Sequence, residues 1–166
     1  MALAIRRFPD PILKRSTHPV ERVDADASKL IERMAATMRA HPRCVGLAAP
    51  QVGSSLRIAV MDSSRNPKVT DSRGLIILIN PSVTVAEGSV VQREGCLSIP
   101  DFTGNVQRAA RVNVRAHDSD GRLQEFWLEG FEAIIAQHEI DHLDGKLFLD
   151  RVANLKTDVF RRKTYF

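Results

Sequence analysis

The chain has 166 residues, a length typical of a single domain. With 43% hydrophobic and 27% charged residues, its composition is that of a folded globular protein and excludes a disordered chain. No segment approaches the roughly 20 consecutive apolar residues of a membrane-spanning helix. The formal net charge of +4 is too small to identify a nucleic acid or another acidic partner by itself. We therefore expect one globular domain over residues 1–166, without a membrane segment.

Cysteine usage and the N-terminal segment predict the compartment. The two cysteines, Cys44 and Cys96, are too few for the disulfide framework of a small secreted protein. Arg6 and Arg7 interrupt the short apolar start, so the segment lacks the apolar run of a secretory signal. We expect a cytoplasmic protein, or an organellar one from which a transit peptide has been removed.

Hydrophobic spacing predicts a first helix and then a series of strands. Acidic and Ser residues precede apolar residues at helical spacing, which indicates a helix over about residues 27–40. Short apolar or alternating runs separated by Ser, Asn, Pro and Gly then predict strands. These strands are RIAVMD (57–62), GLIILINP (74–81), SVTVAE (82–87), RVNVRAHD (111–118) and RLQEFWLEG (122–130). The Asp-Gly pair at residues 120–121 suits a hairpin turn between the last two, so we expect a meandering antiparallel sheet.

A second helix is predicted over residues 130–145. Phe131, Ile134, Ile135, His138 and His142 fall on one helical face, and a glycine at the end of the segment can cap the helix. Several strands followed by a late helix indicate the α+β class.

His138 and His142 form the strongest chemical signal in the sequence. Residues four apart on a helix lie on one face, close enough for two imidazoles to bind one metal ion. Glu139 then lies beside the ion as a candidate general base. Two imidazoles and a carboxylate in an apolar core would each need a buried partner, which disfavours a purely structural interpretation.

A catalytic ion of this kind takes three protein ligands and keeps one position for water. The sequence has neither His nor Glu after His142, which disfavours the metalloproteases that take their third ligand from that region. Cys96 lies at the end of a predicted strand, and a thiolate is a good ligand for a borderline-soft ion. Cys96 is therefore the predicted third ligand.

The stretch CVGLAAPQVG (44–53) is rich in small residues that let the backbone approach another group closely. It lacks the Lys-Ser/Thr of a phosphate-binding loop and the three glycines of a dinucleotide fingerprint. Gln51 is instead a candidate polar donor in an apolar wall.

Three stretches in this order, GLAAPQ (46–51), EGCLS (94–98) and QHEIDH (137–142), resemble the three signature motifs of the peptide deformylase family. The likeness extends from the Pro-Asp-Pro at residues 9–11, through LINP (78–81), to DGKLFLDR (144–151). The resemblance implies an α+β fold with antiparallel β-sheets packed around a central helix that carries the two histidines. It also implies a metal-dependent hydrolase that removes the formyl group from the N-terminal formylmethionine of new polypeptides and releases formate. The implied cofactor is one Fe2+ ion, which Zn2+, Ni2+ or Co2+ can replace.

The resemblance also implies roles for individual residues. The ion would be bound by Cys96, His138 and His142; Glu139 would move protons; and Gln51 with the Leu97 backbone N–H would hold the oxyanion. The peptide would contact Val45, Gly46 and Glu94, and the methionine pocket would be lined by Ile134 and Ile135. Gln137, Asp141 and Arg108 are candidates to support the metal-bound imidazoles. The family commonly has Gly where this chain has Cys44, and Arg where it has Thr103, which bears on peptide affinity more than on chemistry.

Two other interpretations stay open. One is a metalloprotease that cleaves internal peptide bonds with the same helical motif. The other is a basic ribosome- or RNA-binding module whose metal serves folding alone, favoured slightly by the run Arg161, Arg162 and Lys163. One Trp and one Tyr give no aromatic-rich RNA-binding signature. We expect formylmethionyl nascent peptides as partners. The basic tail is a candidate for a contact with the ribosome near its exit site. We expect no direct recognition of nucleic-acid sequence.

Overall fold

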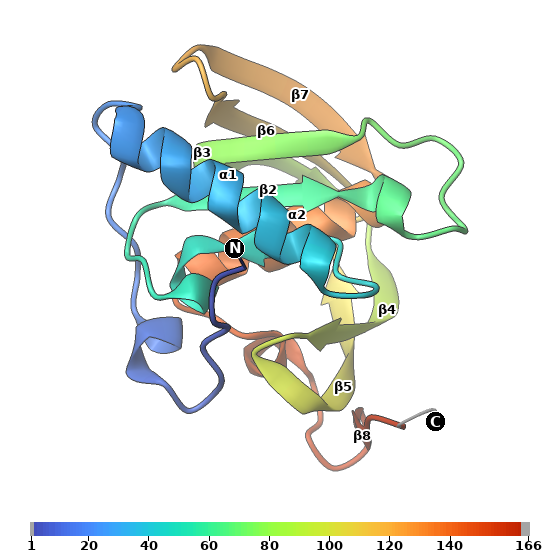
Figure 1. The fold of residues 1–166 in the computed structure, drawn as a ribbon. Coiled ribbons are helices and arrows are strands. Elements are labelled where there is room, and N and C mark those ends of the chain that lie inside the picture. The colour runs from blue at the N-terminus through green and yellow to red at the C-terminus, as the bar shows by residue number, and fades with distance from the viewer. Residues whose placement is uncertain (1, 164–166) are drawn as a thin grey trace.

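The computed structural model describes residues 2–163, so residues 1 and 164–166 of the predicted domain lie outside the described residues. Two α-helices and eight strands form the described chain, with four short 3-10 helices between them (Figure 1). The 3-10 helices are η1 (Pro11–Lys14), η2 (Ala49–Val52), η3 (Ser63–Arg65) and η4 (Phe148–Arg151). None of the helices among residues 2–163 has the length and apolar composition to cross a bilayer.

The larger sheet is antiparallel, with strand order β1-β2-β3-β6-β7. Its strands are β1 (Gly46–Ala48), β2 (Ile58–Asp62), β3 (Leu75–Glu87), β6 (Arg111–His117) and β7 (Leu123–Glu129). The predicted hairpin between the last two is present, and Gly121 in its turn adopts φ 78°. The smaller sheet, also antiparallel, has the order β4 (Val90–Cys96), β5 (Ile99–Arg108) and β8 (Val159–Arg161).

The prediction of two separate strands over residues 74–81 and 82–87 is wrong, because β3 runs through both segments. Pro81 has no N–H for the ladder, and Asn80 adopts φ 52°. The strand absorbs both residues as a shift in its register with β6, between Ile79 and Ser82, and continues. The Asn and Pro that looked like a strand break therefore mark a bulge.

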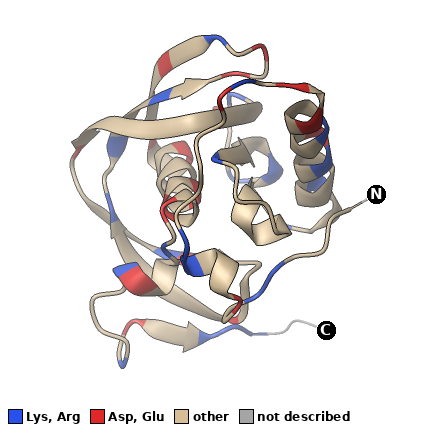
Figure 2. Ribbon diagram, turned by 90° about the vertical axis from the view of Figure 1, so that its left-hand side faces the viewer, with Lys and Arg blue, Asp and Glu red and all other residues tan. Residues whose placement is uncertain are grey.

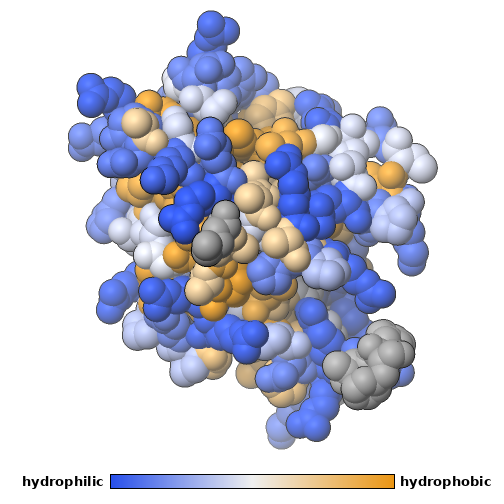
Figure 3. Space-filling view, in the orientation of Figure 1, coloured by the Kyte–Doolittle hydropathy of each residue, from blue (hydrophilic) through white to orange (hydrophobic). Residues whose placement is uncertain are grey.

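The two α-helices, α1 (Ala25–Ala40) and α2 (Gly130–Leu143), cover opposite faces of the larger sheet. Asp24 caps α1 by accepting a hydrogen bond from the Ala27 N–H at 2.8 Å. Because side chains alternate along a strand, Leu47 packs in the cluster that contains α1, and the next residue, Ala48, packs in the cluster that contains α2. On the face seen in Figure 3, apolar residues show between polar ones in the middle of the molecule.

The α2 helix lies between the two sheets and ends sharply. Gly145 adopts φ 76° and its N–H donates to the His142 carbonyl at 3.1 Å, while the Lys146 N–H donates to the Asp141 carbonyl at 2.8 Å. This pair of bonds closes the last turn with a glycine in the left-handed region, as the sequence predicts. The cap fixes the end of α2, and with it the direction in which His142 points.

Candidate metal centre

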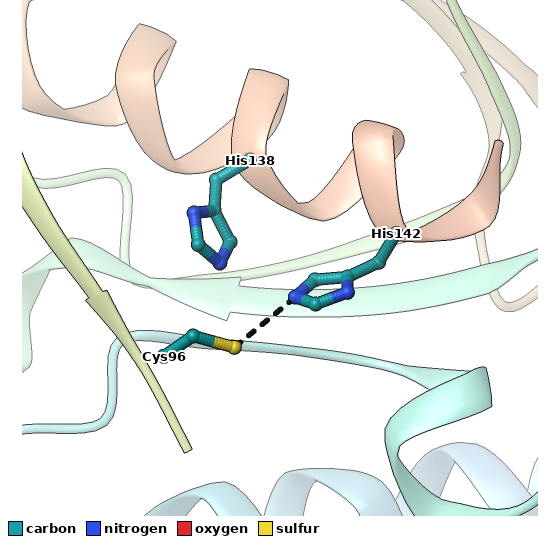
Figure 4. A group of neighbouring side chains, drawn as sticks. All are labelled: Cys96, His138 and His142. Atoms are coloured by element: carbon teal, nitrogen blue, oxygen red, sulfur yellow. Dashed lines mark hydrogen bonds between the residues drawn. The ribbon is translucent and has the colours of Figure 1, made fainter. Parts of the chain in front are cut away.

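Cys96, His138 and His142 come together in the folded chain (Figure 4). All three are buried, and one potential ligand atom from each lies within 4.8 Å of the others. The two histidines project from successive turns of α2, and Cys96 ends β4, so helix and small sheet meet at this point. The Cys96 Sγ lies 3.3 Å from the His142 Nε2.

This donor set fits a divalent ion. One thiolate and two imidazoles are ligands that a borderline-soft ion accepts, and three protein donors leave a fourth tetrahedral position for water or substrate. Burial alone would raise the pKa of the Cys96 thiol, but the adjacent His142 and His138 lower that pKa well below its usual range. The thiolate, which is the form that binds metals, is therefore favoured.

A network of buried charged side chains reaches His138 through its Nδ1 atom. The His138 Nδ1 lies 2.7 Å from Glu94 Oε1, and Arg108 donates to both oxygens of Glu94 at 2.8 Å. Burial raises the pKa of Glu94, but the bonds from Arg108 and His138 outweigh it and lower the pKa to about 2. A carboxylate hydrogen-bonded to the ring nitrogen that faces away from the ligand position fixes the orientation of that imidazole.

The same arginine continues the chain of charges to the end of α2. Arg108 donates to Asp141, whose carboxylate also accepts hydrogen bonds from Arg151 at 2.9 and 3.1 Å. Gln137, the other candidate support, instead bonds with both backbone groups of Ala109 and does not take part in this network. Sequence reasoning missed Arg151, although it lies within the DGKLFLDR stretch that resembles the family.

Glu139 is buried beside the three ligands, and its Oε2 has no hydrogen-bond partner within residues 2–163. Burial raises the pKa of its carboxyl group. Gly46 makes room for it, because a Cβ at residue 46 would lie 2.5 Å from Glu139 Oε1 and 2.9 Å from its Cδ. An unpartnered buried carboxylate with a raised pKa is suited to accept and return a proton.

Gln51 directs its amide nitrogen toward the same centre. Its Nε2 lies 3.3 Å from Cys96 Sγ and 3.2 Å from Ser98 Oγ, while its Oε1 accepts a hydrogen bond from the Ala48 N–H at 3.0 Å. The oxygen is therefore held by the backbone, and the N–H groups face the centre. Sequence reasoning did not single out Ser98, although it is the last residue of the EGCLS stretch.

A cavity of about 350 Å³ opens beside the centre. Its walls contain every residue predicted to bind the metal, act in catalysis or contact the peptide, except His142. These residues are Val45, Gly46, Gln51, Glu94, Cys96, Leu97, Ile134, Ile135, His138 and Glu139. Leu97 lies in the tight turn between β4 and β5. The Glu94 carboxylate lines the cavity while both of its oxygens are bonded to His138 or Arg108.

Cys44 also lines the cavity and is a free, buried thiol. Burial raises its pKa to about 12, with a further contribution from the nearby Glu139 charge. Its Sγ lies 3.2 Å from the Gly46 carbonyl, to which the thiol donates. The other cavity residues that sequence reasoning did not place are Pro42, Arg43, Gln92, Arg93, Gly95, Phe131 and Arg162.

Comparison with a family model and with known proteins identifies relatives of this chain. The family model described as "Polypeptide deformylase" matches residues 2–158. A peptide deformylase of Syntrophobacter fumaroxidans is 44% identical over 161 residues, which are 97% of this chain and 92% of that protein. A peptide deformylase of Mesorhizobium japonicum is 46% identical over 157 residues, covering 94% of this chain and 87% of that one.

Solved structures agree with the sequence relatives. The crystal structure of a peptide deformylase from Legionella pneumophila has a TM-score of 0.85 and 40% identity, covering 94% of this chain and 89% of that chain. A Met-ala-ser bound class I type b peptide deformylase from Acinetobacter baumannii has a TM-score of 0.85 and 35% identity, covering 92% and 99%. The α+β fold predicted from the sequence is confirmed. With its metal-ligand group, its cavity and these matches over nearly its whole length, the chain belongs to the peptide deformylase family.

Proposed function

We propose that the chain is a metal-dependent hydrolase that removes the formyl group from the N-terminal formylmethionine of newly made polypeptides. The observation that carries this proposal is the buried Cys96, His138 and His142 group beside Glu139, at the wall of a peptide-sized cavity, in a member of this family. We further infer that residues 1–166 act as one catalytic domain.

The chemistry divides among a few side chains. A divalent ion held by Cys96, His138 and His142 would supply Lewis acidity and a water of lowered pKa. Glu139 accepts a proton from the attacking water and later returns it to the departing amine, after which formate leaves. The amide N–H of Gln51 and the Leu97 backbone N–H stabilise the negative charge that develops on the formyl oxygen.

The cavity walls account for the substrate. Ile134 and Ile135 offer apolar contact to the methionine side chain, and Val45 and Gly46 line the wall beside the reacting group. We propose that the peptide also contacts Glu94 at the edge of the small sheet. Formyl is the smallest acyl group, so the close walls at Gly46 and Leu97 admit it and exclude bulkier groups.

We propose Fe2+ as the ion, with Zn2+, Ni2+ or Co2+ able to replace it. A thiolate ligand on a ferrous site is sensitive to oxidation. Iron-loaded protein should therefore lose activity in air while nickel-loaded protein keeps it; equal air stability of the two forms would argue against iron.

We infer a cytoplasmic enzyme, because its substrate emerges there and because reduced thiols such as Cys44 and Cys96 persist there. Formylmethionyl nascent peptides are the proposed partners, with a ribosome contact near the exit site through the basic run at residues 161–163. Cutting the chain after Leu155 should weaken ribosome binding if that contact exists.

The experiment that tests the function is formate release from formyl-Met-Ala-Ser by anaerobically purified protein of known metal content. Cleavage of an internal peptide bond in an unformylated peptide is measured in parallel. Formate release without internal cleavage is the expected result. Internal cleavage without formate release would indicate a metalloprotease instead.

A further inference from the structure

Three arginines from separate parts of the chain line the cavity beside the metal-ligand group. Arg43 follows α1 and adopts φ 63°, Arg93 lies in β4, and Arg162 directly follows β8. We call them the arginine rim. Cys96, His142 and Glu139 are buried and His138 is partly buried, whereas Arg43, Arg93 and Arg162 are exposed, so the rim lies at the outer part of the cavity.

The pairing of β8 with β5 places Arg162. Phe102 pairs with Arg161 and Thr103 with Phe160, and the Arg162 N–H donates to the Asp101 carbonyl at 2.8 Å. In Figure 2, basic residues mark this last strand beside the C-terminus. The backbone of Arg162 is thus fixed at the edge of the small sheet.

The Arg162 side chain occupies the space that a side chain at position 95 would take. A Cβ on Gly95 would overlap one guanidinium nitrogen and would lie 3.2 Å from the Arg162 Cζ and 3.5 Å from Thr103 Cγ2. Gly95 lies directly before the metal ligand Cys96. The guanidinium therefore lies over the strand that presents the thiolate, and Arg162 also lines the cavity.

The same strand also anchors a second rim arginine. The Arg93 guanidinium stacks on the Phe160 ring, with its Cζ 3.7 Å from the ring centroid. Because Phe160 lies in β8, this short strand orients Arg93 and also leads directly into Arg162.

The positive charge of the rim is not balanced within the described chain. Among residues 2–163, no carboxylate lies within ion-pair distance of Arg43, Arg93 or Arg162. Glu94 and Glu139 line the cavity as well, but both are buried, and Glu94 is paired with Arg108. A cleft whose exposed charges have one sign attracts ligands of the opposite sign.

We propose that Arg162, assisted by Arg43 and Arg93, selects formylated peptides that carry an acidic side chain in the second or third residue. This inference rests on the proposed function, since the formylmethionyl residue must occupy the inner cavity for the next residues to reach the rim. Arg162 acts here as a specificity-determining residue and takes no part in the chemical step.

The test compares matched peptides with amidated C-termini: formyl-Met-Asp-Ser against formyl-Met-Asn-Ser, and formyl-Met-Ala-Asp against formyl-Met-Ala-Asn. We expect the native enzyme to favour at least one Asp peptide in kcat/KM by about three- to fivefold, the size of an exposed charge pair. Arg162→Gln should abolish the preference through KM with kcat unchanged, and Arg162→Lys should retain part of it. In 1 M NaCl, where the Debye length is about 3 Å, the preference should vanish.

Arg161→Gln is the matched control, because it removes the same charge from the neighbouring residue of β8, which does not line the cavity. The proposal is overturned if the native enzyme does not distinguish Asp from Asn peptides, if Arg162→Gln keeps the preference, or if Arg161→Gln abolishes it equally. Calorimetric binding of amidated Met-Asp-Ser and Met-Asn-Ser to the metal-loaded protein provides a readout without turnover. Absence of formate release from every peptide would refute the proposed function. The same binding comparison, extended to amidated Met-Ala-Asp and Met-Ala-Asn and repeated with Arg162→Gln, would still decide the role of Arg162.

Discussion

Glu139 is a carboxylate whose burial raises its pKa and whose Oε2 has no partner within residues 2–163. Glu139→Gln keeps the shape of the side chain but can neither accept nor return a proton. We expect the variant to bind metal as the native protein does and to lose formate release by about 100-fold or more, the usual contribution of a general acid–base group. Metal analysis and initial rates measure the two effects separately.

Glu129→Gln is the matched control for this variant, since it makes the same change at an exposed residue directly before α2. It should release formate at the native rate. If Glu139→Gln were fully active, Glu139 could not be the base.

Cys44 and Cys96 are both buried thiols, but their surroundings shift their pKa values in opposite directions. A pKa near 12 leaves Cys44 almost entirely protonated at neutral pH, and only the thiolate reacts with iodoacetamide. We expect no adduct on metal-loaded native protein at pH 7.5 and two adducts after unfolding, as measured by intact mass. An adduct mapped to Cys44 in the native protein would contradict this account.

At the residue scale, the sequence predicts a site more readily than it predicts the groups that support it. The spacing of His138 and His142 and the thiol of Cys96 follow from local motifs, and the structure brings them together. The link from His138 through Glu94 to Arg108 depends on the register of β4 with β5, which no local pattern specifies. The peptide contact expected of Glu94 stays a prediction.

At the scale of elements, the buried ion network joins β4, β5 and α2 through Arg108. Its side chain is almost fully buried between the carboxylates of Glu94 and Asp141. Arg108→Met would leave two buried acids without their shared cation, so we expect unfolding to require about 3–5 kcal/mol less free energy. Urea unfolding of the metal-loaded protein measures this loss.

Arg151→Met serves as a comparison within the same network. Arg151 pairs with Asp141 too, but 44% of its side chain is exposed, so the loss should be about 1 kcal/mol or less. Equal losses for the two variants would show that burial does not set the strength of this network.

The helices and the β6–β7 hairpin could be predicted because each carries a complete local signal. The α1 and α2 helices have apolar periodicity and end signals, and the hairpin has alternation with an Asp-Gly turn. Two of the strands that were not predicted, β5 and β8, lack such signals: IPDFTGNVQR does not alternate cleanly, and VFR is too short. These strands exist because neighbouring strands pair with them, which is information that a local pattern does not contain.

For the molecule as a whole, the metal-ligand group lies beside the large hydrophobic cores and not inside them. Cys96 belongs to the smallest of the three buried hydrophobic clusters, with residues of the smaller sheet, and to neither of the two larger clusters on the faces of the larger sheet. We therefore expect chelated protein to keep its far-UV circular dichroism spectrum and to lose formate release, and addition of Ni2+ to restore activity. Unfolding on chelation would indicate a structural ion.

The position of β8 near the end of the chain ties the rim of the cleft to the metal centre during synthesis. Only 20 residues separate His142 from Arg162. The ribosomal exit tunnel holds a longer segment than this, so His142 is still inside the tunnel when Arg162 is added. The metal centre and the β8 edge of its cleft therefore become free to fold at the same time, once the chain is released.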